Sequence, residues 1–103
     1  MAYGAGGEKA ADTLIERHIA GAAAWDPPPL EPSASASTQV SVDGAAPGDI
    51  AVASHSGVVD AELQLTAAAA NGSVAVLLRN AGGEAVDVPP GRLTVLVTKL
   101  SLL

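Results

Sequence analysis

The sequence predicts a mainly β protein, a small antiparallel β-sandwich or barrel of about six strands with an N-terminal amphipathic helix and a Pro-rich extended strap. After residue 37, apolar residues alternate with polar or small ones, which is the period of half-buried strands. Pro-Gly and Asn-Gly dipeptides separate these alternating runs. Near the start of the chain, apolar residues instead recur at the three- and four-residue spacing of a helix.

Length and composition limit the chain to one small domain. It has 103 residues, of which 49% are hydrophobic, but 22 are alanine and only 2% of the chain is aromatic. The core must therefore be thin and built from Val, Leu and Ile. A chain of this size buries only about 60–65% of its unfolded surface. We expect modest stability unless a partner covers part of the surface, so composition favours assembly.

The first segment, residues 1–24, is predicted to be a helical arm. Over residues 8–22 one helical face carries Ala11, Leu14, Ile15, His18, Ile19 and Ala22. Gly21 is a plausible helix stop. Because an isolated helix of this length is marginal in water, Leu14, Ile15 and Ile19 must dock on something. The sequence leaves open whether this is the protein's own body or another subunit.

The second segment, residues 25–36, is predicted to be an extended strap. Its four prolines forbid helix and favour a polyproline-like path. Trp25 stands at its start, where the ring can anchor the strap to an apolar surface. We expect Trp25, Pro27 and Pro28 to contact a partner; the alternative is a lid over the protein's own core.

The third segment, residues 37–103, is predicted to be the β-sandwich body with an apolar C-terminal tail. Strands are expected around residues 39–42, 50–53, 63–66, 74–79, 85–88 and 93–98. The side chains expected to point inward are Val40, Val42, Ile50, Val52, Leu63, Leu65, Val74, Val76, Leu78, Leu93, Val95 and Val97. The turns expected between them are type I′ at Asn71-Gly72, type II at Pro47-Gly48 and Pro90-Gly91, and a looser turn over residues 80–83.

Several classes of function find no support in the residues. The net charge is −6 and the five basic residues are scattered, which argues against direct nucleic-acid binding. No apolar run is long enough to span a membrane. The absence of cysteine excludes disulfides and thiolate chemistry.

Neither histidine has a convincing catalytic or ligand setting. His18 lies on the apolar face of the predicted helix, where packing or an interface explains it. His55 lies between two serines without a nucleophile elbow or oxyanion-hole motif, so we expect a solvated loop. The carboxylates follow no calcium-loop pattern. The sequence therefore predicts a protein that is not an enzyme and holds no cofactor or metal.

Two features suggest an interaction surface. Leu77 and Leu96 point to the polar faces of their predicted strands, and the chain ends in the apolar tail Leu100-Ser101-Leu102-Leu103. The alternative is that tail and helix pack together over one sheet. The predicted partner contacts are Leu14, Ile15, Ile19, Trp25, Pro27, Pro28, Leu77 and Leu96.

The order of strands and turns resembles small β-sandwich virion proteins of tailed bacteriophages. The segments that carry the resemblance are Trp25-Asp26-Pro27-Pro28, Val40-Ser41-Val42, residues 44–54, Ala70-Asn71-Gly72-Ser73-Val74-Ala75-Val76, residues 79–83 and residues 86–95. Together they extend over about residues 25–98, and the N-terminal arm departs from the pattern.

The resemblance implies a non-enzymatic capsid decoration or cement subunit, made in the host cytoplasm and located on the capsid surface. Its implied partners are the major capsid protein and neighbouring copies of itself, as a homo-oligomer on the lattice, with no direct nucleic-acid or membrane partner. No catalytic residue carries over. The alternative is a small binding module of a phage tail or fibre that recognises a host surface.

Overall fold

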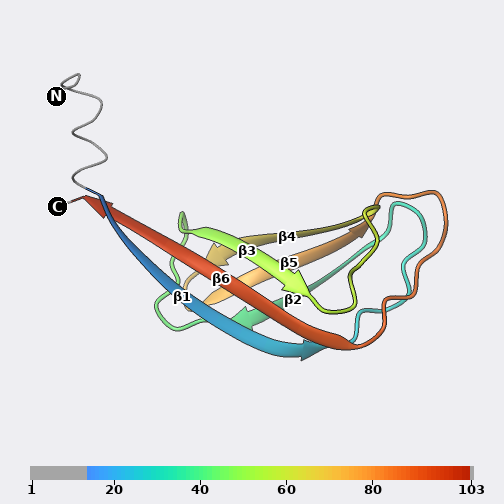
Figure 1. The fold of residues 1–103 in the computed structure, drawn as a ribbon, viewed down its shortest axis with the longest axis horizontal. Coiled ribbons are helices and arrows are strands. Elements are labelled where there is room, and N and C mark those ends of the chain that lie inside the picture. Colours follow the sequence, from blue (N-terminus) through green and yellow to red (C-terminus); the bar gives the residue numbers. More distant parts are fainter. Residues whose placement is uncertain (1–13, 103) are drawn as a thin grey trace, which may run out of the picture.

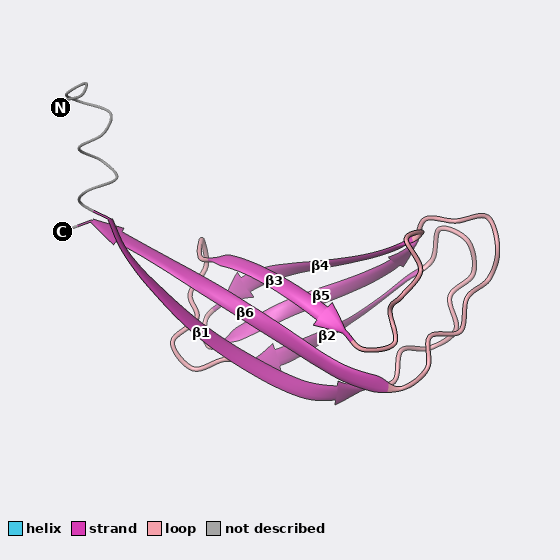
Figure 2. Ribbon diagram, in the orientation of Figure 1, coloured by secondary structure: helices cyan, strands magenta, loops and turns pink. Residues whose placement is uncertain are grey.

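The computed structural model describes residues 14–102, which form two three-stranded antiparallel sheets (Figure 1). The strands are β1 (Leu14–Trp25), β2 (Ser35–Ser41), β3 (Ile50–His55), β4 (Leu63–Ala70), β5 (Ser73–Asn80) and β6 (Gly91–Leu102). The first sheet has the order β1-β6-β3 and the second the order β2-β5-β4. The two sheets face each other across the core, and Figure 2 shows only strands and loops in the described part. The predicted mainly β class is confirmed.

The predicted N-terminal helix is wrong for residues 14–22. These residues belong to β1, which pairs with β6 without interruption from Leu14↔Leu102 to Trp25↔Gly91. Residues 8–13 of the predicted helix lie outside the described residues. The same stretch also has a period of two. From Ile19 on, every second residue, including Gly21 and Trp25, faces the second sheet. A long ladder to β6 and burial of this face outweigh the helix propensity of alanine. Residues 14–24 are therefore a strand of the sandwich.

Gly21 is a point of close approach between the sheets, and it stops no helix. A Cβ atom at position 21 would lie 2.8 Å from the carbonyl oxygen of Ser41 and 2.9 Å from Cγ2 of Val42. Real Cβ atoms do not approach a fixed backbone atom this closely. A side chain at position 21 would therefore push β1 away from β2.

We expect Gly21→Ala to lower the free energy of unfolding by about 1–3 kcal/mol, the usual cost of overpacking a core. Chemical denaturation measures this directly. Ala22→Val is the control, because Ala22 is the exposed neighbour on the same strand and its change should stay within about 0.5 kcal/mol. Equal stabilities for Gly21→Ala and the unaltered protein would contradict the close approach.

The predicted strap connects the two sheets at one end of the sandwich. Pro27 and Leu30 are buried, and Leu30 forms a single β-bridge with Val86. That bridge is all that remains of the strand predicted over residues 85–88. The count of six strands was correct because β1 takes the place of this one.

The core contains most of the residues expected there. One buried cluster gathers Val40, Val42, Ala45, Val74, Val76, Leu93, Val95 and Val97, and a second gathers Leu30, Leu63, Leu78 and Val88. Leu65 is partly buried against both clusters.

β3 is the exception, because its predicted facing is wrong. Ile50 and Val52 point outward, while Ala51, Ala53 and His55 point inward. The alternation of β3 is equally regular on both faces, so the period alone could not select the buried one. With Ala51 and Ala53 facing inward, His55 also faces inward and forms a hydrogen bond to the end of β1.

The turns confirm one specific prediction and correct two. Pro47-Gly48 forms the expected type II turn, with Gly48 at φ +92° and the Asp49 N–H donating to the Ala46 carbonyl. Gly72 has φ +72° but Asn71 does not have positive φ, so the turn between β4 and β5 is not type I′. Gly91 also lacks positive φ, because it begins β6.

An ion pair closes the end of the sandwich near the Pro47 turn. Lys99 Nζ lies 2.6 Å from Asp49 Oδ2 and donates a second hydrogen bond to the Gly44 carbonyl at 2.9 Å. The Lys99 hydrogen bond is the main cause that lowers the pKa of Asp49; the Ala46 N–H and the positive charges of Lys99 and Arg17 lower it further. This pair ties β6 to the loop that leads into β3.

The lowered pKa of Asp49 makes stability pH-dependent. A carboxyl group whose pKa is lower in the folded than in the unfolded state stabilises the fold above its unfolded pKa of about 3.9. This contribution is lost as the pH falls through the folded pKa. We therefore expect the midpoint temperature of thermal unfolding to decrease once the pH is below about 4. The decrease should be smaller in Asp49→Asn. Parallel acid profiles for the two proteins would contradict a role for Asp49.

Asn80 connects two loops at the opposite end. It is fully buried at the end of β5. Its Nδ2 donates to the carbonyl oxygens of Leu30 at 3.1 Å and Glu84 at 2.7 Å, and its Oδ1 accepts from the Gly82 N–H at 2.9 Å. Its own backbone N–H donates to the Ala34 carbonyl. One side chain thus satisfies backbone groups of the connection after β1 and of the loop after β5.

Candidate interaction surface

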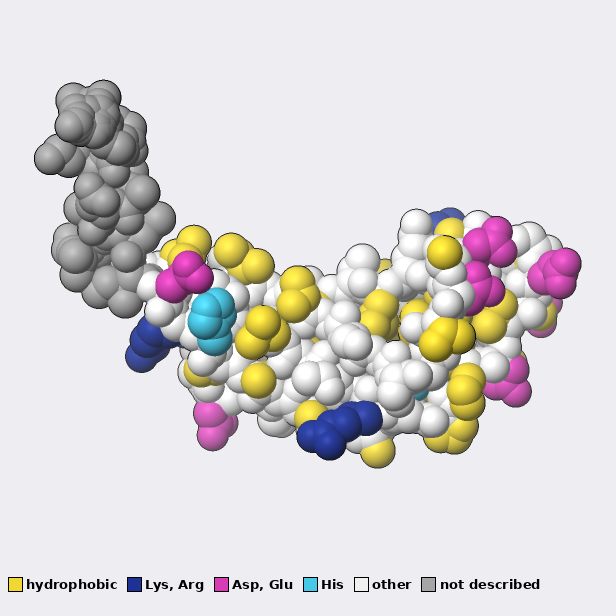
Figure 3. All heavy atoms as spheres, in the orientation of Figure 1, with side chains coloured by type: hydrophobic (Ala, Val, Ile, Leu, Met, Phe, Trp, Pro, Cys, Tyr) yellow, Lys and Arg dark blue, Asp and Glu magenta, His cyan; other side chains and the backbone are white. Residues whose placement is uncertain are grey.

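The outer face of the first sheet carries large apolar side chains that the core does not use. Ile50 and Val52 of β3 are 53% and 55% exposed, and Leu96 and Leu100 of β6 are 40% and 49% exposed. Because alternate side chains of a strand point to opposite faces, these four share the face turned away from the second sheet. We call this the outer apolar face. Figure 3 shows hydrophobic side chains spread along it.

Strand register brings these residues into contact range. Val52 lies opposite Leu96, which lies opposite Ala20 of β1 on its other side. Ile50 lies in the next row, opposite Thr98. Directly opposed Cβ atoms in such pairs are about 4.5–5.5 Å apart. Val52, Leu96 and Ala20 therefore form one apolar row across the three strands, and Ile50 is a diagonal neighbour of Leu96 and Leu100.

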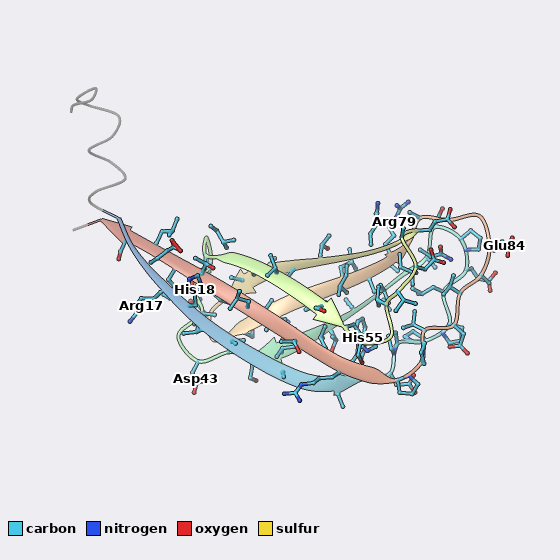
Figure 4. All side chains as sticks on the ribbon, viewed as in Figure 1. Arg17, His18, Asp43, His55, Arg79 and Glu84 are labelled. Carbon is cyan, nitrogen blue, oxygen red and sulfur yellow. The ribbon has the colours of Figure 1, made fainter. Side chains whose placement is uncertain are left out.

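Polar groups border the outer apolar face at the end where β1 begins and β6 ends. His18 Nδ1 lies 3.1 Å from Thr98 Oγ1, and His18 Nε2 lies 3.5 Å from Glu16 Oε2. Figure 4 places His18 and Arg17 at this end and His55 in the other half. At the opposite end, Arg92 is exposed and pairs with Ala24. An apolar centre with a polar border is typical of protein contact surfaces.

The β1–β6 pair extends beyond the rest of the sandwich. β3 pairs with β6 only as far as Thr98, whereas β1 and β6 continue as a two-stranded ribbon from Arg17↔Lys99 to Leu14↔Leu102. Figure 1 shows this ribbon projecting past the other four strands. Two strands alone are marginally stable in water, so this ribbon would gain from a partner.

The predicted contact residues fall in different places. Leu14 and Ile15 belong to the projecting ribbon, and Leu96 lies in the outer apolar face. Leu77 is 42% exposed but lies on β5, on the outer face of the second sheet. The structure therefore separates the two leucines that the sequence grouped together.

Three of the other predicted contacts, Ile19, Trp25 and Pro27, lie against the protein's own interior. Ile19 and Trp25 are half-buried against the core, and Pro27 is buried. Pro28 is exposed. Trp25 packs against both core clusters, as the lid alternative expected.

The sequence missed Ile50 and Val52 as surface residues because it assigned them to the core. A single valine does not indicate which face of a strand it occupies. The signal that could have found them is the other half of β3, where small alanines alternate with the larger residues. Alanine suits a narrow gap between sheets, whereas isoleucine suits a face with space in front of it.

His55 has a structural setting that the sequence did not anticipate. It is 4% exposed, and the solvated loop predicted for it is wrong. Its Nε2 donates to the Trp25 carbonyl at 2.9 Å, and its Nδ1 accepts from the Gly57 N–H at 3.1 Å. Its ring also meets the Trp25 ring edge to face at 5.9 Å between centroids. Both ring nitrogens thus hold the end of β1 against the turn after β3.

Within residues 14–102, no three His, Asp or Glu side chains come together in a way that could hold a metal ion. The same part of the chain contains no helix long and apolar enough to cross a membrane.

Comparisons with protein-family models, curated proteins and solved structures find no match to this chain.

Proposed function

We propose that the protein is a non-enzymatic capsid decoration subunit of a tailed bacteriophage, which binds the outside of the head lattice through its outer apolar face. The observation that carries the proposal is the row of exposed apolar residues over β3 and β6. A monomer in water gains nothing from exposing Ile50, Val52, Leu96 and Leu100 on one sheet face. The virion context comes from the resemblance of the strand and turn order.

The energetics fit a subunit that acts in many copies. Covering the exposed halves of these four side chains contributes about 3–6 kcal/mol gross, from about 1.5–3 kcal/mol per fully buried side chain. Loss of rigid-body freedom offsets much of this, so one isolated site binds weakly. Neighbouring copies that contact one another on a lattice strengthen binding without further contacts to the shell.

Binding to heads that lack this protein tests the proposal. The test variant is Val52→Thr/Leu96→Gln, which keeps side-chain size and removes apolar surface. The matched control is Leu77→Gln, because Leu77 and Leu96 are exposed to nearly the same extent but lie on opposite sheets. Co-sedimentation with heads measures binding, and circular dichroism checks that all variants fold.

We expect the double variant to bind at least tenfold more weakly per site and Leu77→Gln to bind like the unaltered protein. Tenfold corresponds to about 1.4 kcal/mol. If Leu77→Gln weakens binding and the double variant does not, the second sheet is the docking surface. If the unaltered protein binds no head, the capsid role is wrong.

A further inference from the structure

β1 is an edge strand whose outer backbone edge is open. Antiparallel pairing with β6 uses the peptide groups on one side of β1. Within the described residues, no other backbone hydrogen bond involves residues 14–24. The N–H and C=O groups on the outer side are therefore available to another strand.

The usual protections of an edge strand are missing from most of β1. Proteins block such edges with proline, bulges, charges or short length. β1 has twelve residues in unbroken register and no proline, and after His18 it carries no charged residue. The opposite edge of this sheet is β3, which has only six residues and contacts the second sheet more extensively than β1 does. β1 is thus the edge best suited to accept a strand.

The sequence of β1 is compatible with pairing to itself about a two-fold axis. In an antiparallel pair centred on Ala20, Glu16 lies opposite Ala24, Arg17 opposite Ala23, and His18 opposite Ala22. Every charged or titratable side chain then faces an alanine. Pairs centred on Glu16 or Arg17 would instead oppose like charges, which is destabilising. The register centred on Ala20 pairs residues 15–25 of each copy, and no other two-fold register of β1 pairs more residues.

We propose that two copies of this chain associate through antiparallel β1 edges centred on Ala20. The two first sheets then form one six-stranded sheet with the order β3-β6-β1-β1-β6-β3. Opposed residues of an antiparallel pair point to the same side, so the outer apolar faces of both copies become continuous. This association does not depend on the proposed binding to heads.

Introducing a charge at the two-fold axis tests the register. Sedimentation equilibrium of the full chain should give twice the chain mass of 10.1 kDa. Ala20→Lys and Ala20→Glu should each be monomeric, because like charges then face one another, and an equimolar mixture of the two should recover the dimer. The control is Ala75→Lys, an exposed alanine of β5 on the other sheet, which should remain dimeric.

Cross-linking gives a second readout because the chain has no cysteine. Ala20→Cys should form a disulfide dimer on oxidation, since the Cα atoms of opposed residues are about 4.5–5.5 Å apart, which a disulfide can span. Ala24→Cys alone should not, because two copies of residue 24 lie eight residues apart along the pair, about 26 Å. A mixture of Ala24→Cys and Glu16→Cys should cross-link.

Three results would overturn the proposal. One is a monomer at every concentration examined, and another is a dimer that Ala20→Lys leaves intact. The third is cross-linking of Ala24→Cys alone as readily as Ala20→Cys.

Discussion

Asn80→Asp is expected to lower the free energy of unfolding at neutral pH by about 3–5 kcal/mol, the usual effect of an uncompensated buried charge. The native amide donates to two carbonyl oxygens, of Leu30 and Glu84. A carboxylate of the same shape would place an acceptor against both of them. Because a domain of this kind is stable by only about 5–15 kcal/mol, the variant should lose a large part of its stability.

The loss of unfolding free energy in Asn80→Asp should depend on pH in a defined direction. A buried carboxyl that faces two carbonyl oxygens and has only the Gly82 N–H as a donor is more stable when protonated, so the variant should lose stability as the pH rises above about 4. Urea denaturation at pH 4 and pH 7 measures this. The control is Asn71→Asp, the same chemical change at an exposed turn position, which should stay within about 0.5 kcal/mol. Equal effects of the two changes would show that Asn80 does not join the loops.

Removal of β1 has the second large expected effect. A chain that begins at Asp26 lacks the whole partner of β6 on one side, together with the core contacts of Ile19 and Trp25. It also lacks the carbonyl that His55 holds. We expect this chain to lose the cooperative thermal transition in circular dichroism, because the core between the sheets becomes open to water.

The control for this truncation removes residues 100–103 from the other end. Residues 100–102 extend β6 only where it pairs with the projecting end of β1, beyond the reach of β3. The trimmed chain should unfold cooperatively with a modestly lower midpoint. If the chain that begins at Asp26 keeps the midpoint of the unaltered protein, β1 is an attached arm, as the helical period suggested.

The sequence predicts the body well because its signals there are local and repeated. In β5 and β6, valine and leucine alternate with other residues through several two-residue repeats. The expected core residues Val76 and Val95 are fully buried. The Pro47-Gly48 turn was predictable because proline fixes φ at the first central position and glycine accepts positive φ at the second.

The sequence fails where two patterns overlap and distant contacts choose between them. Residues 14–22 fit a helical face as well as a strand, and only the ladder to β6, some eighty residues away, selects the strand. Ile50 and Val52 fit either face of β3. The candidate surface was consequently only partly predictable: Leu96 was named, but its neighbours Ile50 and Val52 were assigned to the core.

A cryo-electron microscopy reconstruction of decorated heads tests the central claim most directly. The proposed function expects the outer apolar face, with Val52 and Leu96 at its centre, to lie against the capsid lattice and Leu77 to face away from it. A reconstruction in which Leu77 contacts the shell while Val52 and Leu96 face solvent would contradict it.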